Sequence, residues 1–260
     1  MKTVILAGGL GTRIADEINT RPKPMVEVGG QPMLWHIMKH YSFFGFNEFI
    51  ICCGYKGHEI KEYFADYYLH RSDITFDFTD NNRMTVHSNL AEPWKVTLVN
   101  TGQFSQTGAR ISKIQKYVDD ESFFLTYGDG VSNIDLNTLL QFHKKQGKII
   151  TISAVQPGGR FGVPDFKEDA IVSGFREKAK ADGGWINAGF MVCNSGIFHY
   201  LSSHDDCILE REPFEKLAAD GEMSAYCHRG FWKCMDTQRD RSELEKLWNA
   251  GSPPWKIWED

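Results

Sequence analysis

A glycine-rich turn directly after the first apolar run is the sequence feature that most restricts the possible folds of this chain. Residues 3–6 read as a strand, and the chain continues as Gly8-Gly9-Leu10-Gly11-Thr12-Arg13. Glycine lets backbone N–H groups approach an anion closely and turn toward it. A strand followed by such a turn is typical of α/β proteins that bind phosphate, although a tight structural loop has the same pattern.

Two common phosphate-binding motifs do not fit this turn. The Walker motif requires Gly-Lys followed by Ser or Thr, which the chain lacks. The dinucleotide fingerprint requires a third glycine where Ile14 stands, and an acidic residue where Cys53-Gly54 ends the second strand. Arg13 and Lys23, the latter held between two prolines, instead favour a triphosphate site. Lys23 alone would be interpreted as a solvated side chain.

The first part of the chain alternates short apolar runs with amphipathic stretches, as βαβ units do. We expect strands at residues 3–6, 49–53, 122–127 and 149–155, and helices at 34–41, 57–68 and 135–146, the last ended by Gly147. Residues 74–100 interrupt this alternation and predict a hairpin excursion. Later residues predict antiparallel strands at 170–176, 188–193 and 224–228, and helices at 212–220 and 237–248.

Composition narrows the classes of ligand. A formal net charge of −5 argues against a general nucleic-acid binder, which would normally be basic. No apolar segment approaches a membrane-spanning length, and the first apolar run is too short for a secretory signal. The six cysteines show no CxxC pairing, so we expect buried free thiols. These features predict a cytoplasmic protein with no nucleic-acid or membrane partner.

Two aspartates are candidates for a site at the edge of the sheet. Asp129 stands between Gly128 and Gly130, after a buried strand, where ligands of open α/β sheets collect. Asp236 precedes an amphipathic helix. Each has a plainer interpretation, Asp129 as part of a simple turn and Asp236 as a helix N-cap.

The segment of residues 6–13, followed by Pro22-Lys23-Pro24-Met25, resembles the signature of the sugar-1-phosphate nucleotidyltransferases. The resemblance implies a Rossmann-like, mixed but mainly parallel sheet flanked by helices, with a β-rich sugar-binding elaboration in the C-terminal part. It implies a catalytic set of Arg13, Lys23, Asp129 and Asp236, the two aspartates holding Mg²⁺. The implied nucleotide-binding residues are Leu6, Ala7, Gly8, Gly9, Leu10, Gly11, Thr12, Arg13, Lys23, Ser105, Arg110 and Gly128.

The second half of the chain resembles the sugar-phosphate side of the same family. Phe175-Arg176-Glu177-Lys178 matches its Glu-Lys element, with Ala179 where the family usually has proline. The implied sugar-phosphate residues are Tyr127, Gly162, Glu177, Lys178 and Asn187. In isolation Glu177-Lys178 would be interpreted as a solvated pair. The resemblance predicts one domain over residues 1–260, with a nucleotide-binding portion at 1–155 and a sugar-phosphate portion at 156–260.

The base-reading region resembles the cytidylyl-transferring branch of the family. The glutamine-rich segment of thymidylyl- and uridylyltransferases is missing, and Ser105-Gln106-Thr107-Gly108-Ala109-Arg110 stands before the Asp129 region. The resemblance implies that CTP and glucose 1-phosphate give CDP-glucose and pyrophosphate, with the sugar phosphate as nucleophile and no general base. An ordinary helix start, with Ser105 or Thr107 as cap and Arg110 exposed, is the competing interpretation.

Assembly and rival functions complete the expectations. Family members are homo-oligomers, including hexamers, and act in the synthesis of surface polysaccharides. Aromatic residues at 43–44, 67–68, 255 and 258 are compatible with subunit contacts if they are exposed. A metal-dependent glycosyltransferase is one rival, although Asp129 is followed by Gly130-Val131 rather than by a second acid. A non-catalytic nucleotide-sugar sensor and a transferase with another phosphorylated acceptor are the others.

Overall fold

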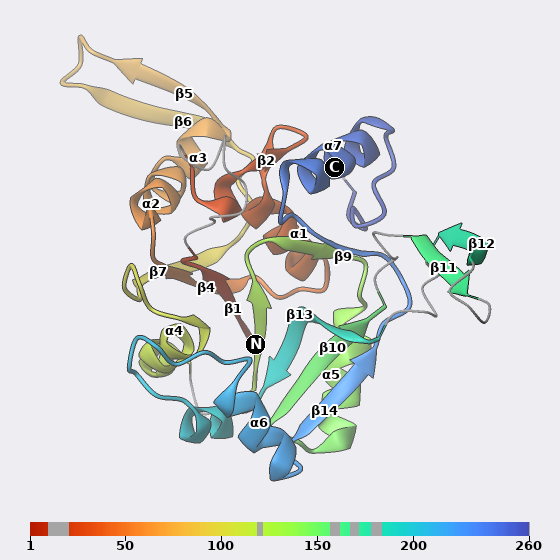
Figure 1. Ribbon diagram of the computed structural model, residues 1–260. Coiled ribbons are helices and arrows are strands. Elements are labelled where there is room, and N and C mark those ends of the chain that lie inside the picture. The colour runs from red at the N-terminus through yellow and green to blue at the C-terminus, as the bar shows by residue number, and fades with distance from the viewer. Residues whose placement is uncertain (10–20, 119–121, 157–161, 167–171, 178–183, 260) are drawn as a thin grey trace.

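The computed structural model describes residues 1–260 apart from 10–20, 119–121, 157–161, 167–171, 178–183 and 260, and gives the backbone alone for 162–166 and 172–177. Its centre is a seven-stranded sheet in the order β14-β10-β13-β8-β1-β4-β7 (Figure 1). These strands are β1 (Lys2–Ala7), β4 (Glu48–Cys53), β7 (Lys95–Asn100), β8 (Phe123–Tyr127), β10 (Ile150–Val155), β13 (Ile186–Cys193) and β14 (Met223–Cys227).

The pairing of the strands confirms a mixed, mainly parallel sheet. β1 pairs in parallel with β4 and β8, and β4 pairs in parallel with β7. β13 is antiparallel to both β8 and β10. The expectation of antiparallel pairing at 224–228 is wrong, because β14 is hydrogen-bonded to β10 in parallel. β14 does run opposite to β13, but β10 lies between them in the sheet.

Alternation along the strands divides the core between two faces of the sheet. Ile5 and Ala7 pack in a cluster with α1 (Met33–Phe43), α2 (Gly57–Ala65) and α5 (Leu136–Gln146). Val4 and Leu6 pack in a second cluster with α4 (Thr107–Lys113) and α6 (Glu212–Ala219). Successive side chains of a strand point to opposite faces, so one apolar strand supplies both clusters.

The helix predicted at 135–146 is confirmed together with its ends. Asp135 accepts a hydrogen bond from the Thr138 backbone N–H at 2.8 Å, which satisfies a free donor of the first turn. Gly147 ends the helix in the left-handed region, at φ 62°. The helix predicted at 57–68 is instead interrupted at Asp66, which separates α2 from α3 (Tyr67–His70).

The C-terminal segment builds a third cluster against α1. Trp255 and Trp258, which follow α7 (Gln238–Asn249), are only 1% and 7% exposed. The Trp255 indole N–H donates to His36 Nδ1 at 3.4 Å. The two tryptophans are therefore not exposed for subunit contacts, because the end of the chain folds back onto the helix. Tyr67 is buried as well, whereas Phe43 and Tyr68 are exposed.

Short strand pairs lie outside the central sheet. The hairpin of β5 (Ser72–Asp77) and β6 (Arg83–Asn89) projects from the body of the molecule (Figure 1), which confirms the predicted excursion. The remainder of that region, at 95–100, joins the sheet as β7. The other pairs are β2 (Glu27–Val28) with β3 (Gln31–Pro32), β9 (Gly130–Ser132) with β15 (Trp232–Cys234), and β11 (Gly162–Phe166) with β12 (Val172–Glu177).

The short 3₁₀ segments and the cysteines complete the description. The 3₁₀ segments are η1 (Lys23–Met25), η2 (Gln115–Tyr117) and η5 (Ser195–Tyr200). All six cysteines are free, as predicted, but only Cys52, Cys53 and Cys193 are buried, whereas Cys207 and Cys234 are half-buried and Cys227 is exposed. Among the described residues, none of the helices combines the length and the apolarity that a membrane crossing requires.

Candidate functional site

The site lies where β1 and β8 end at the same edge of the sheet. Leu6 is in register with Tyr127, and the backbone N–H of Gly128 donates to the Leu6 carbonyl at 3.0 Å. Parallel strands place their carboxyl ends together, so the turn after each strand faces the same space. Two adjoining cavities open there, and both have Tyr127 and Asp129 in their walls.

We call the two spaces the loop cavity and the strand cavity. The loop cavity is lined by Leu6, Ala7, Gly8, Gly9, Lys23, Pro24, Ser105, Gln106, Thr107, Arg110, Tyr127, Gly128 and Asp129. The strand cavity is lined by Thr126, Tyr127, Asp129, Gly130, Asn187, Ala188, Trp232, Cys234 and Asp236. Together they extend from the glycine turn after β1 to β13.

A lysine and two carboxylates meet at the boundary of the cavities. Lys23 Nζ lies 2.5 Å from Asp129 Oδ2 and 2.6 Å from Asp236 Oδ1, although the two aspartates are far apart in the sequence. Burial opposes the charge of Lys23, but the carboxylates of Asp129 and Asp236 outweigh it and raise the pKa of Lys23. One ammonium group therefore lies between two converging carboxylates and offsets the charge of only one of them.

The local backbone explains why the two aspartates converge. Asp129 occupies the tight turn between β8 and β9, and its carbonyl accepts from the Met235 backbone N–H at 2.8 Å. Asp236 is the residue before the helix cap: Thr237, not Asp236, is the N-cap of α7. The Asp240 carboxylate accepts from the Asp236 backbone N–H at 3.2 Å. The Asp236 side chain is thus left to face Asp129, and its interpretation as an N-cap is wrong.

Arg110 is a buried cation that lies on the glycine turn. Its guanidinium donates to the carbonyl of Gly8 at 2.8 Å, to the carbonyl of Gly102 at 2.7 Å and to Thr101 Oγ1 at 2.7 Å. A side chain at Gly8 would collide with this group, so only glycine permits the approach. Burial lowers the pKa of Arg110. In the described part of the chain, no carboxylate lies at ion-pairing distance from it, and its direct hydrogen-bond partners are carbonyl groups and the Thr101 hydroxyl.

Ser105 is held by a second charged pair beside Arg110. The Ser105 hydroxyl lies 2.6 Å from the Asp205 carboxylate, and Lys113 Nζ lies 2.5 Å from the same oxygen. Neither Ser105 nor Thr107 caps α4, whose N-cap is Gln106 without a side-chain hydrogen bond. The interpretation of this segment as an ordinary helix start with an exposed arginine is therefore wrong, since Ser105 and Arg110 are both buried.

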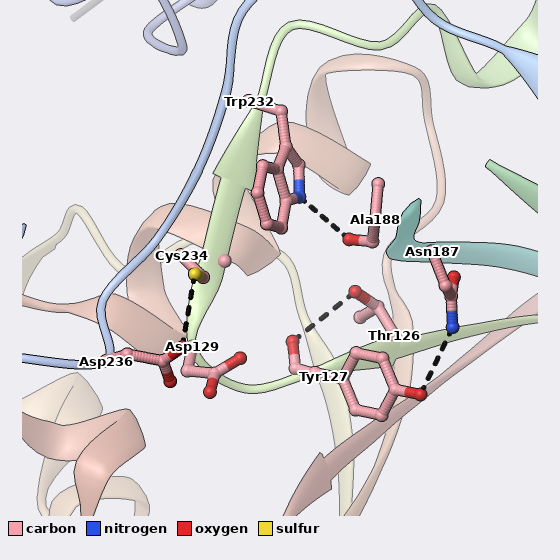
Figure 2. A pocket seen from close by; sticks show the side chains of 9 residues that line it. Thr126, Tyr127, Asp129, Asn187, Ala188, Trp232, Cys234 and Asp236 are labelled. Atoms are coloured by element: carbon pink, nitrogen blue, oxygen red, sulfur yellow. Dashed lines mark hydrogen bonds between the residues drawn. The ribbon is translucent and has the colours of Figure 1, made fainter. Parts of the chain in front are cut away.

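Neutral polar groups line the strand cavity. Figure 2 shows the Asn187 side chain turned toward the Tyr127 hydroxyl, to which its amide nitrogen donates at 3.3 Å. The Trp232 indole N–H donates to the Ala188 carbonyl at 2.8 Å, which ties β15 to β13. Cys234 lies 3.5 Å from Asp236, and burial, followed by the nearby Asp236 and Asp129 charges, raises its pKa to about 12. Cys234 is accordingly a thiol at neutral pH.

The structure brings together most of the residues predicted from the sequence. The loop cavity contains Leu6, Ala7, Gly8, Gly9, Lys23, Ser105, Arg110 and Gly128, and the strand cavity contains Asn187 and Asp236. Gly162 and Glu177 face each other in register at the ends of β11 and β12. The predicted residues Leu10, Gly11, Thr12, Arg13 and Lys178 lie outside the described residues.

Several residues at the site were missed by sequence reasoning. The Tyr127 hydroxyl donates to Glu210 Oε1, Asp205 and Lys113 hold Ser105, and Trp232 forms part of the strand-cavity wall. Glu210 and Tyr127 are 83 positions apart in the sequence. Trp232 lies four residues before Asp236 in the sequence, whereas Glu210 carries no local motif at all.

The donor set at the boundary suits a hard cation. Among the residues described, no group of three or more His, Cys, Asp or Glu side chains could hold a metal ion by itself. Two carboxylates nevertheless converge on one ammonium, so their oxygens already surround a position of positive charge. Magnesium is commonly bound by one or two carboxylates together with substrate phosphates. Asp129 and Asp236 therefore fit a divalent cation that arrives with a nucleotide.

Comparison with known proteins gives a consistent assignment. The family model described as nucleotidyl transferase matches residues 2–260. Glucose-1-phosphate cytidylyltransferases from Salmonella typhimurium (strain LT2) and Salmonella typhi are each 54% identical over 260 residues, covering 100% of both chains. The solved structure of HddC from Yersinia pseudotuberculosis superposes with a TM-score of 0.68 at 24% identity, covering 95% of this chain and 99% of that one. This last similarity concerns the fold.

Proposed function

This chain belongs to the nucleotidyl transferase family, and we propose that it condenses CTP with α-D-glucose 1-phosphate to give CDP-glucose and pyrophosphate. The proposal on substrates is supported by 54% identity, over the whole chain, to two glucose-1-phosphate cytidylyltransferases. A phosphate oxygen of the sugar phosphate attacks the α-phosphorus of CTP, and the bond from that phosphorus to the pyrophosphate oxygen breaks.

One observation carries the proposal for the site. Asp129 and Asp236 meet at Lys23, at the boundary between a cavity floored by the glycine turn and a cavity lined by Asn187. Two anionic substrates that must react would meet at such a boundary. Their mutual repulsion is relieved there by cations fixed in advance, which is the main requirement of phosphoryl chemistry.

The loop cavity is the proposed nucleotide side. The backbone of residues 6–9 faces the phosphates, and Leu10, Gly11, Thr12 and Arg13 extend the same turn in the sequence. Arg110 has no carboxylate partner among the described residues, so a polyphosphate would supply the counter-charge that carbonyl dipoles supply only in part. Ser105 and Gly128 line the same space.

The strand cavity is the proposed sugar-phosphate side. Asn187 Nδ2 has a second N–H beyond the one given to Tyr127, which can donate to a sugar hydroxyl. Glu177, Lys178 and Gly162 are assigned to the same substrate by their resemblance to the family elements. No general base is assigned, because the sugar phosphate is ionised at neutral pH and attacks as an anion.

Mg²⁺ is the proposed cofactor, held by Asp129 and Asp236 with phosphate oxygens of the substrate. When bound, it neutralises the charge that gathers on the α-phosphate. Lys23 Nζ is the group within reach of both carboxylates and of the loop cavity, so we assign it to a phosphate oxygen of the nucleotide.

The remaining assignments concern location and assembly. We place the reaction in the cytoplasm, in keeping with six free thiols. We assign residues 1–155 to binding of the nucleotide and residues 156–260 to binding of the sugar phosphate.

We also propose that the protein is a homo-oligomer, such as a hexamer. The projecting β5–β6 hairpin supports this proposal, because its side chains Phe76 and Phe78 are 52% and 79% exposed. Light scattering after size exclusion would measure the mass, and a monomer at working concentration would contradict this assignment.

A pyrophosphate-release assay tests the proposed reaction most simply. It compares the four nucleoside triphosphates with several sugar 1-phosphates in the presence and absence of Mg²⁺. Release that requires CTP, glucose 1-phosphate and Mg²⁺ together is the expected result. Release with CTP and a different phosphorylated acceptor would replace glucose 1-phosphate as the proposed acceptor. Sugar transfer from a finished nucleotide sugar would identify a glycosyltransferase instead.

A further inference from the structure

Glu210 lies between the two cavities without lining either one. It belongs to the segment of residues 205–210, which precedes α6 and crosses the start of α4. This segment is fixed to α4 by backbone contacts: the Gln106 N–H donates to the Asp205 carbonyl at 2.8 Å, and the Ala109 N–H donates to the Cys207 carbonyl at 3.1 Å. Glu210 is exposed, yet its carboxylate has a partner on each side.

The two oxygens of Glu210 bind two different hydroxyls of the cavity walls. Oε1 accepts from the hydroxyl of Tyr127, which stands in the wall between the cavities. Oε2 accepts from Thr107 Oγ1 at 2.7 Å, and Thr107 lines the loop cavity. The Thr107 oxygen in turn accepts from the Leu209 backbone N–H at 2.9 Å. One carboxylate therefore bridges the nucleotide side and the sugar-phosphate side.

The carboxylate also sets the direction of the hydrogen bonds that lead into the strand cavity. An ionised carboxylate only accepts, so the single hydroxyl hydrogen of Tyr127 must point to Glu210. The Tyr127 oxygen is then left to accept from Asn187 Nδ2 at 3.3 Å, as Figure 2 shows. Asn187 Oδ1 completes the chain by accepting from the Gly189 N–H at 3.0 Å. Asn187 is thus held with its amide nitrogen toward the cavity.

We propose that Glu210 is a positioning residue that fixes Tyr127 and Asn187 for the sugar phosphate and Thr107 for the nucleotide. This inference rests on the proposed function for the identity of the two substrates. Glu210 touches neither cavity, so it acts only through the side chains that it holds. Its removal takes away the acceptor that orients the hydrogen of each hydroxyl, and each substrate then has to order one wall of its own cavity on binding.

Single replacements separate the two hydrogen bonds of the Glu210 carboxylate, the first with Tyr127 and the second with Thr107. We expect Glu210→Ala to raise the KM for glucose 1-phosphate and the KM for CTP, each by about fivefold, the scale of one lost hydrogen bond. Tyr127→Phe removes the first hydrogen bond and raises the KM for the sugar phosphate alone. Thr107→Val removes the second hydrogen bond and raises the KM for CTP alone. Glu210→Gln, which keeps an acceptor for Tyr127, retains most of the sugar-phosphate affinity.

The decisive experiment is a double-mutant cycle between Glu210→Ala and Tyr127→Phe, with Glu215→Gln as a surface control on α6. If Glu210 acts through Tyr127, the second replacement adds little to the first. Full additivity, or unchanged KM values in Glu210→Ala, would overturn the inference. A wild-type protein that makes no CDP-glucose from CTP and glucose 1-phosphate would instead overturn the proposed function, and this inference with it. Thermal unfolding of each variant checks that the fold is retained.

Discussion

The loop cavity and the strand cavity adjoin each other, yet they are built from different chemical groups. The loop cavity contains two cations, Lys23 and Arg110, and Arg110 is held by the carbonyls of Gly8 and Gly102. Apart from the two aspartates at the boundary, the strand cavity is bordered by neutral groups in a directed chain of hydrogen bonds that includes Asn187 and Tyr127. Fixed charge suits a polyphosphate, whereas neutral directional groups suit sugar hydroxyls.

The two cavities also differ in how far their residues contribute to the stability of the fold as well as to binding. Arg110 is buried and holds the glycine turn in place, so it contributes to the folded structure as well as to the proposed nucleotide site. Among the described residues, the Asn187 side chain is hydrogen-bonded to the Tyr127 hydroxyl and to the Gly189 backbone N–H. Changes in the loop cavity should therefore affect stability and activity together, and changes in the strand cavity should affect activity alone.

The largest effect is expected at Asp129, which both cavities share. Asp129→Ala should lower turnover by about a hundredfold or more while the protein stays folded, because half of the proposed cation site is lost. Steady-state kinetics and circular dichroism measure the two quantities. Asp66→Ala, on the exposed end of α2, is the matched control and should behave as wild type. Normal turnover of Asp129→Ala at limiting Mg²⁺ would remove Asp129 from the mechanism.

Arg110→Met should lower both stability and nucleotide affinity. The replacement removes the charged donors to the carbonyls of Gly8 and Gly102 and to the Thr101 hydroxyl, so we expect a loss of about 2–3 kcal/mol in the free energy of unfolding and a KM for CTP raised about tenfold. Urea denaturation and kinetics measure these changes. Arg110→Lys keeps the charge but loses the planar guanidinium, so its free energy of unfolding and its KM for CTP should lie between those of the wild type and of Arg110→Met. Unchanged stability in Arg110→Met would show that the contacts around Gly8 do not hold the loop.

Asn187→Ala should act on the sugar side only. We expect the KM for glucose 1-phosphate to rise about tenfold, because a hydrogen bond to a sugar hydroxyl is lost, while the KM for CTP and the melting temperature stay near wild type. Kinetics with each substrate varied in turn separate the two constants. An equal rise in both KM values would mean that the two cavities are not specialised in the way described above.

The smallest effect is expected in the pH dependence of stability, and it concerns His36, which lines neither cavity. Burial lowers the pKa of His36 to about 4, and its Nδ1 already accepts from the Trp255 indole N–H, so the folded protein disfavours the protonated ring. The unfolded chain binds this proton near its ordinary pKa, so stability falls as the pH drops from about 6.5 toward 4. Replacing His36 by Asn should reduce the loss of unfolding free energy between about pH 7.5 and 5.5 by about 1 kcal/mol.

Urea denaturation at the two pH values measures this loss for the wild type and the variant. The same acid-induced loss in both proteins would exclude His36 as its source. The KM values compared at the same two pH values form the control, since His36 packs against the C-terminal segment and lines neither cavity.

The sequence predicted those parts of the molecule that depend on local pattern. The strand at residues 3–6, the turn after it and the helix between Asp135 and Gly147 are encoded by alternation and capping, and the structure confirms their existence and type. Asp129 was recognisable because it follows a buried strand. The roles of the site residues stay predictions until they are measured.

Other features could not be predicted because they depend on contacts between distant segments. The Trp255 side chain is buried only because the C-terminal segment folds back onto α1, and β14 is parallel to its neighbour only because β10 lies between it and β13. Glu210 reaches Tyr127 because the segment of residues 205–210 crosses α4. No periodicity or motif along the chain specifies such pairings.

A crystal structure of the protein with CTP and Mg²⁺ tests the central claim most directly. The account predicts that the triphosphate lies over the backbone of Gly8 and Gly9, with the metal ion bound between Asp129 and Asp236 and Lys23 turned to a phosphate oxygen. A triphosphate bound away from this turn, or a metal ion that contacts neither aspartate, would contradict it.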